Sequence, residues 1–108
     1  MTTRILLLTH APLATALREC ALHVFADSAD DVLALDVPPS EAPEATLERA
    51  LAMLVAHGGL DTPTLVLTDL FGATPCNVAQ RLTGLLQARL VAGVNLPMLL
   101  RSITYRHE

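Results

Sequence analysis

His10 and Asp69 are the two residues of this sequence best placed to do chemistry together. His10 lies two residues after the apolar run at residues 5–8, and Asp69 directly follows a second such run at residues 65–68. In an open parallel sheet, ligands bind outside the carboxyl ends of the strands, where the winding direction reverses. A carboxylate that accepts a proton from one imidazole nitrogen fixes the tautomer and leaves the other nitrogen free to react. The pair therefore predicts a nucleophilic histidine that is oriented by an acid.

The loop that follows Asp69 adds groups that can bind an anion. Residues 72–75, Gly-Ala-Thr-Pro, are typical of a turn into a helix, with Thr74 as N-cap and Pro75 as the first helical residue. Backbone N–H groups at a helix start attract negative charge, and the helix dipole adds to this attraction. Asp69 also suits an Asx turn and Thr74 a cap, and both structural roles are compatible with function. With His10, the loop indicates a pocket for a phosphoryl group on an imidazole.

Other catalytic and metal-binding patterns are missing from the sequence. It contains no G-x-x-x-x-G-K-[ST], G-x-G-x-x-G or G-x-S-x-G motif. It also contains no lysine, which the phosphorylation site of a receiver domain uses. The remaining histidines complete no metal-ligand spacing, and we expect them to be structural or solvated: His23, His57 and His107. The sequence therefore predicts no metal site.

Composition excludes several classes of partner. The formal net charge is −4, all seven basic residues are arginines, and aromatic residues make up 3% of the chain. Binding to nucleic acid or to an anionic membrane needs a basic patch, which this balance disfavours. The apolar runs are far shorter than the roughly 20 residues that cross a bilayer. At 108 residues, the chain is predicted to form one domain, residues 1–108, in the cytoplasm.

Two further groups of residues are interpreted structurally. Cys20 and Cys76 lie far apart in segments with helical spacing, and they are predicted to be reduced and to pack as small apolar groups. An acidic series at i, i+3 and i+4 spacings is most simply a solvated helix face: Glu41, Glu44 and Glu48.

Strand and helix patterns alternate along the chain. Short apolar runs predict strands at residues 5–8, 32–36, 65–68 and 89–93. Helical spacing joins them over residues 13–24, with Pro12 in the first turn, and over a segment that Ser40 caps and Gly58-Gly59 ends. A third helix follows Thr74, and residues 95–97 lead into a last apolar stretch near residue 105. The sequence thus predicts an α/β fold, an open four-stranded parallel sheet of order 2-1-3-4 with helices on both faces.

Three segments resemble the IIA component of the mannose family of the bacterial phosphoenolpyruvate-dependent sugar phosphotransferase system. They are L-T-H at residues 8–10, T-D-L-F-G-A-T-P-C-N at residues 68–77 and A-G-V-N-L-P-M-L at residues 92–99. The resemblance implies a phosphohistidine carrier in sugar uptake. His10 would accept the phosphoryl group on Nε2 from the phosphocarrier protein HPr and pass it to a IIB domain, while Asp69 holds Nδ1–H. No cofactor is implied.

The same resemblance assigns the loop after Asp69 to the phosphoryl group. In the family, a small hydroxyl residue, here Thr74, forms a hydrogen bond to the phosphate. We expect the phosphoryl-binding residues to be Phe71, Gly72, Ala73 and Thr74.

The resemblance also implies a homodimer. Family members commonly run some twenty residues further than Glu108 and use that segment, including an exchanged strand, to pair. The chain is therefore expected to be C-terminally short relative to the family. Three alternatives stay open from the sequence: a regulatory phosphorelay protein without transport, a phosphotransfer subunit of the dihydroxyacetone kinase type, and a binding module that holds an anion without becoming phosphorylated.

Overall fold

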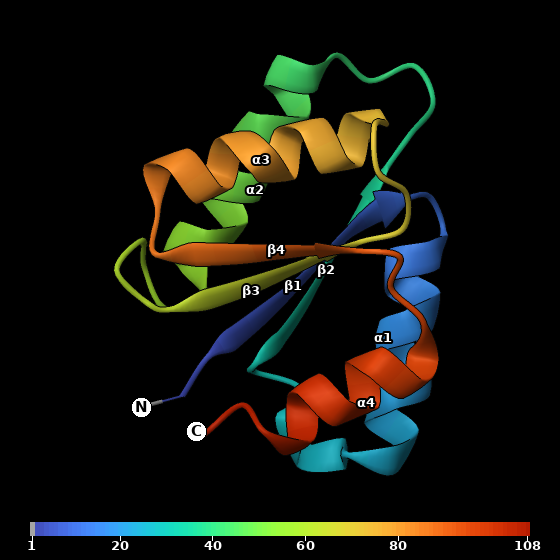
Figure 1. Cartoon of the computed structure of the whole chain (residues 1–108), viewed down its shortest axis with the longest axis vertical. Helices are drawn as coiled ribbons and strands as arrows, with labels where there is room; N and C mark the ends of the chain where they lie inside the picture. Colours follow the sequence, from blue (N-terminus) through green and yellow to red (C-terminus); the bar gives the residue numbers. More distant parts are fainter. Residues whose placement is uncertain (1) are drawn as a thin grey trace.

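The computed structural model describes residues 2–108 as a parallel sheet between two layers of helices (Figure 1). The elements in chain order are β1 (Arg4–His10), α1 (Leu13–Val24), the 3₁₀ helix η1 (Ala26–Ser28), β2 (Val32–Val37), α2 (Pro43–Ala56), β3 (Thr64–Thr68), α3 (Thr74–Leu85), β4 (Ala88–Ala92) and α4 (Leu96–Thr104). The four strands lie in the order β2-β1-β3-β4, and every neighbouring pair is parallel. The predicted fold class and strand order are confirmed.

The sheet has a different apolar layer on each face. Leu6 and Leu8 of β1 pack in the cluster that includes α2 and α3, whereas Ile5 and Leu7 pack in the cluster that includes α1 and α4. All four side chains are completely buried. Burial of one such side chain stabilises a fold by about 1.5–3 kcal/mol, so β1 anchors both layers. The continuous apolar run predicted this two-sided burial.

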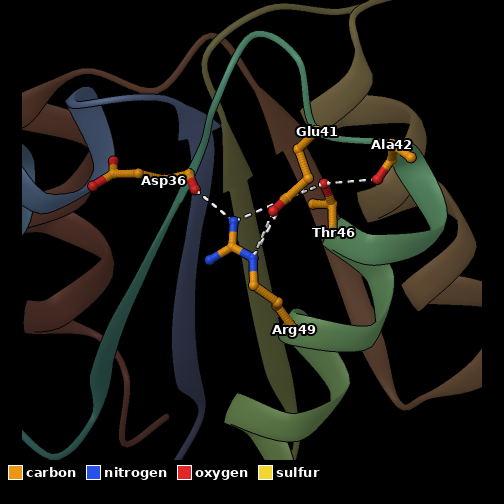
Figure 2. A network of polar contacts seen from close by, with 5 residues as sticks. All are labelled: Asp36, Glu41, Ala42, Thr46 and Arg49. Carbon is orange, nitrogen blue, oxygen red and sulfur yellow. Dashed lines mark hydrogen bonds and ion pairs between the residues drawn. The ribbon is translucent and has the colours of Figure 1, made fainter.

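A polar network replaces the predicted cap of α2 (Figure 2). The expected N-cap, Ser40, lies outside the helix, which begins at Pro43 after Ala42 and has no side-chain cap. The Glu41 carboxylate instead accepts a paired contact from Arg49, Nε to Oε2 at 3.0 Å and Nη2 to Oε1 at 2.8 Å, and a hydrogen bond from the Thr46 hydroxyl. Glu41 is therefore not a residue of the solvated helix face, and these hydrogen bonds lower its pKa.

The network also holds the end of β2. Arg49 Nη2 donates to the backbone carbonyl of Asp36 at 2.8 Å (Figure 2). The Asp36 carboxylate in turn accepts from the backbone N–H and the hydroxyl of Thr15, near the start of α1. Pro12, expected in the first turn of α1, is instead its N-cap residue and supplies no capping bond. Asp36 of β2 takes over this function, since it accepts the N–H of Thr15 in the first turn. The carboxyl ends of β1 and β2 are fixed together.

Several apolar positions of the helices are exposed, and one of them, Cys20, was predicted to pack as a small apolar group. Cys20 is exposed, whereas Cys76 is buried as expected, and both are free cysteines. Val24, Val55 and Leu85 are also exposed, by 60%, 59% and 63%. Each of the three lies in the last turn of its helix. Of the helices described in residues 2–108, none combines the length and hydrophobicity needed to span a bilayer.

Arg4 links the first strand to the end of α2. Its guanidinium donates from Nη1 to the carbonyls of Leu54 and His57, each at 3.0 Å, and from Nε to the Thr64 hydroxyl at 2.9 Å. Only 3% of the residue is exposed, and burial lowers its pKa. The terminal carbonyls of a helix lack intrahelical partners. Arg4 satisfies the carbonyl of His57 and adds a donor to that of Leu54, which also accepts the N–H of Gly59 at 3.0 Å.

We expect the substitution Arg4→Met to destabilise the fold by at least about 2 kcal/mol, since it removes three hydrogen bonds from a charged group, each of which contributes on the order of 1.5–3 kcal/mol. Urea unfolding of the purified protein measures the change. Arg81, an exposed residue of α3, provides the control, because Arg81→Met should alter stability by less than about 0.5 kcal/mol. Equal effects of the two substitutions would contradict a structural role for Arg4.

Candidate active site

His10 and Asp69 meet at the carboxyl edge of the sheet. His10 is the last residue of β1, and Asp69 directly follows β3, the neighbouring strand. The distance between His10 Nδ1 and Asp69 Oδ2 is 2.9 Å, and the same oxygen accepts the backbone N–H of His10 at 3.2 Å. The contact predicted from the two strand ends is present.

The carboxylate determines which ring nitrogen carries a proton. Burial favours a higher pKa for Asp69, but the hydrogen bonds from the His10 side chain and backbone outweigh it and lower the pKa. An ionised carboxylate can only accept, so the proton in the contact belongs to Nδ1 of His10. In the neutral ring, the lone pair is then on Nε2. Because 44% of the His10 side chain is exposed, against 13% of Asp69, solvent reaches the ring but not much of the acid.

The strand on the other side of β1 also positions His10. His10 lies opposite Val37 in the register of β1 and β2. The carbonyl of Val37 accepts the N–H of Ala11, the residue after His10, at 3.1 Å. Because Arg49 and Asp36 fix the end of β2, this contact connects the polar network of Figure 2 with the backbone of the site. The histidine is thus held on one side by Asp69 and on the other by β2.

The loop from Asp69 to α3 is shaped to leave backbone donors available. Asp69 Oδ1 accepts the N–H of Leu70 at 3.0 Å, which forms the first turn of the loop. Gly72 has φ of +82°, a conformation that other residues rarely adopt. The N-cap of α3 is Ala73, and no side chain caps the helix. Pro75 has no N–H, and the N–H of Asn77 donates to the carbonyl of Ala73 at 2.9 Å. Within residues 2–108, the N–H groups of Thr74 and Cys76 have no backbone acceptor and remain able to bind an anion.

Thr74 was predicted to be the N-cap, and this prediction was wrong. Thr74 is instead the first helical residue and Pro75 the second, because Ala73 takes the extended cap conformation. Its hydroxyl, half-buried, makes no hydrogen bond within residues 2–108, and capping therefore does not occupy it. Of the other predicted phosphoryl-binding residues, Gly72 and Phe71 are exposed and Ala73 is half-buried. All four belong to the segment that carries Asp69.

The residues that follow β4 carry part of the family resemblance, but the sequence pattern predicted neither a helix there nor a place beside the site. The N–H of Val94 donates to the carbonyl of Thr68 at 2.9 Å, which places this loop beside the end of β3. Asn95 caps α4, since its side chain accepts the N–H of Met98 at 2.9 Å. The Asn-Leu-Pro order, an N-cap residue followed by proline in the first turn, is the signal that could have predicted this helix.

The other histidines lie away from this site in the structure. His57 Nδ1 is 2.8 Å from the carbonyl of Met53 at the end of α2, and His107 Nδ1 is 2.8 Å from the hydroxyl of Thr2. His23 is exposed in the last turn of α1. Among residues 2–108, no three His, Cys, Asp or Glu side chains form a group that could hold a metal ion.

Comparison with known proteins identifies relatives over the whole described fold. The sequence profile of the family described as "PTS system fructose IIA component" matches residues 4–108. The mannose/sorbose specific IIA subunit of the phosphotransferase system from Enterococcus faecalis is 31% identical, with a TM-score of 0.85 over 97% of this chain and 78% of that one. No curated protein matches the chain.

Two further solved structures are similar. The PTS IIA protein associated with the fucose utilization operon of Streptococcus pneumoniae is 27% identical, with a TM-score of 0.76 over 98% of this chain and 82% of that one. Component EIIA from Streptococcus agalactiae, at 24% identity and a TM-score of 0.79, covers 97% of this chain and 79% of that one and supports the fold alone. This chain belongs to the family of phosphotransferase system IIA components, and it is a phosphotransfer carrier in sugar uptake.

Proposed function

We propose that His10 is the residue that carries the phosphoryl group, on Nε2, and that it takes this group from HPr and passes it to a IIB domain in the cytoplasm. The observation that carries the proposal is the double contact of Asp69 Oδ2 with the backbone N–H and Nδ1 of His10. That contact directs the ring and keeps the proton on Nδ1. A histidine with this tautomer has its nucleophilic lone pair on the exposed side.

The chemistry requires only an exchange of nitrogen–phosphorus bonds. The lone pair of Nε2 attacks the phosphorus of the donor phosphohistidine, a new N–P bond forms, and the donor imidazole leaves with the electron pair of the old bond. His10 becomes more cationic as the bond forms, and the adjacent carboxylate of Asp69 stabilises that charge. In this proposal, the N–H groups of Thr74 and Cys76 at the start of α3 and the Thr74 hydroxyl donate to the phosphoryl oxygens. In the transfer to the IIB domain, phosphorylated His10 is the donor. An acceptor group of that domain attacks the phosphorus, and the imidazole of His10 leaves with the electron pair of the N–P bond.

Exposed apolar side chains next to the site support docking of a protein partner. Leu70 and Phe71 follow Asp69 directly and are 58% and 78% exposed, and Leu13 at the start of α1 is 37% exposed. Exposed aromatic and aliphatic residues of this kind form the centres of protein interfaces. The alternatives of a regulatory relay or a dihydroxyacetone kinase subunit gain no support from the comparisons.

We expect His10→Ala to abolish phosphorylation, because within residues 2–108 no other imidazole is in contact with a carboxylate. Incubation with phosphoenolpyruvate, enzyme I and HPr, followed by intact-mass analysis, should detect one acid-labile phosphoryl group on the unchanged chain. His23→Ala, a change of an exposed histidine on α1, is the control and should retain full labelling. Labelling of the His10 variant would exclude that residue, and no labelling of the unchanged chain would favour a plain anion-binding module.

We expect Asp69→Asn to slow phosphorylation roughly 10- to 100-fold while the fold is retained, because a neutral amide no longer enforces the Nδ1–H tautomer with a charged hydrogen bond of about 1.5–3 kcal/mol. Rapid-quench measurement of the transfer from phosphorylated HPr tests the rate. Asp61→Asn, in an exposed turn, is the matched control. A rate equal to that of the control would remove Asp69 from the mechanism.

The same variant tests the electrostatics of Asp69. Its folded-state pKa is lowered, so the unfolded chain binds more protons and stability rises with pH in this range. The contribution is present above the ordinary Asp pKa of about 3.9 and is lost as the pH falls through the lower folded-state value. Urea unfolding at several pH values should show this loss in the unchanged chain and less of it in Asp69→Asn. Identical pH profiles would contradict the lowered pKa.

A homodimer that pairs through β4 is part of the proposal. The two edges of the sheet differ: Arg18 and Arg49 donate to the carbonyls of Val32 and Asp36 along β2. Within residues 2–108, no side chain makes a hydrogen bond to the backbone of β4, and its Val91 is 40% exposed. An open edge strand is a template for pairing with another strand.

We expect Val91→Lys to weaken the dimer by at least about tenfold, since a charge on an edge strand opposes strand pairing. Sedimentation velocity over a range of protein concentrations measures the monomer–dimer equilibrium. Val55→Lys, which changes an equally apolar and more exposed residue of α2, should leave the equilibrium unchanged. A chain that remains monomeric throughout, or equal effects of both variants, would reject pairing through β4.

A further inference from the structure

A cavity lies at the opposite end of the sheet from His10. It has a volume of about 620 Å³ and lies between the last turn of α4 and the first residues of β3 and β4. These elements meet on the side of the molecule where both termini lie (Figure 1). We call it the amino-end cavity. Neither the proposed phosphoryl transfer nor the docking of its protein partners uses it.

The floor of the amino-end cavity is apolar. Ile5, Leu65 and Arg89 are opposite one another in adjacent strands and form a row across the sheet. Ile5 is fully buried, Leu65 is half-buried and Arg89 is exposed, so the covering layer ends before it reaches β4. Pro63 and Leu86 complete the apolar part of the lining. The floor can therefore hold an apolar or aromatic body.

The rim of the amino-end cavity is cationic, although the whole chain has a net charge of −4. Arg89 lines it from β4 and takes part in no ion pair among residues 2–108. Arg106 lines it from the end of α4, and 10% of its side chain is exposed. Its Nε forms an ion pair with Asp31 at 2.9 Å and its Nη1 donates to the carbonyl of Ile103, so within residues 2–108 only Nη2 is without a contact. Tyr105, also in the lining, is covered by the guanidinium of Arg101, 5.5 Å from the ring centroid. An anionic group is the complement of this rim.

We propose that the amino-end cavity binds a small organic anion, with its carboxylate or phosphate on Arg89 and Arg106 and its apolar or aromatic part against Leu65 and Leu86. Ligand cavities commonly measure about 300–1,000 Å³ and combine an apolar lining with a few polar anchors, as this one does. Guanidinium groups bind carboxylates and phosphates in the same two-pronged geometry. The arginines thus favour ligands with a negative charge, and the apolar floor favours ligands with an apolar or aromatic part.

The test is an NMR titration of the isotope-labelled chain with adenosine monophosphate and with phenylacetate, which carry the two kinds of anion. Adenosine and phenylacetamide are the neutral counterparts. At least one anionic probe should cause saturable shifts in the amides of β3, β4 and the last turn of α4, with binding about tenfold or more stronger than that of its neutral counterpart. The probe that saturates at lower concentration identifies the anion as phosphate or carboxylate.

Two variants locate the site. Arg89→Gln should weaken binding of the anionic probe about tenfold, whereas Arg81→Gln, which changes an exposed arginine of α3, should not. Several results would overturn the proposal: no saturation up to about 10 mM of either anion, equal binding of the neutral counterparts, or equal affinity in Arg89→Gln. Shifts confined to the loop after Asp69, or shifts that follow protein concentration instead of probe concentration, would also overturn it. Labelling of His10 should be normal in Arg89→Gln, so the two proposals stand or fall separately.

Discussion

One oxygen atom, Oδ2 of Asp69, organises the site. It accepts hydrogen bonds from the backbone N–H and from ring Nδ1 of His10. The two bonds together fix the orientation of the imidazole relative to the backbone of β1. The two hydrogen bonds also explain how a partly buried acid remains ionised, because they outweigh the effect of burial on the pKa of Asp69. The tautomer of His10 follows from that ionisation. Backbone geometry, charge state and nucleophilicity therefore depend on the same contact.

The rest of the fold keeps this contact in place. β1 is buried on both faces and lies between β2 and β3. His10 is its last residue, so neighbours on both sides fix the backbone position of the histidine. Asp69 comes from β3, and the end of β2 is fixed by the network of Asp36, Glu41 and Arg49 (Figure 2). Buried apolar packing thus sets the strand positions, and polar contacts at the strand ends set the direction of the functional side chains.

The sequence predicted the parts of the fold that depend on local pattern. Continuous apolar runs mark buried parallel strands, and the alternation of strands and helices leaves few topologies, so the strand order and the approach of His10 to Asp69 followed from the pattern. The cap of α2 did not, because Arg49, Glu41 and Thr46 stabilise that helix start through contacts formed only after folding. Ser40 has the right side chain but the wrong position. Cys20 likewise has helical spacing, yet it faces solvent.

Features that combine distant segments were out of reach of sequence reasoning. The amino-end cavity joins Ile5, Leu65, Arg89 and Arg106, which come from four different elements or their ends. No spacing rule relates such residues, since their proximity depends on strand register and on where α4 stops covering the sheet. The difference between the two edges of the sheet also depends on distant segments. The arginines that donate to the backbone of β2 come from α1 and α2.

The unequal edges of the sheet limit how copies of the chain could associate. Arg18 and Arg49 occupy backbone acceptors of β2, so an incoming strand finds no continuous row of partners there. If copies of the chain could pair through both edges of the sheet, they would form an endless ribbon. If they pair through β4 alone, neither copy of the pair has a second free edge for a further copy. Pairing of β4 with the β4 of a second copy would be self-complementary and would end at a closed pair with twofold symmetry, which would protect the protein from fibre formation.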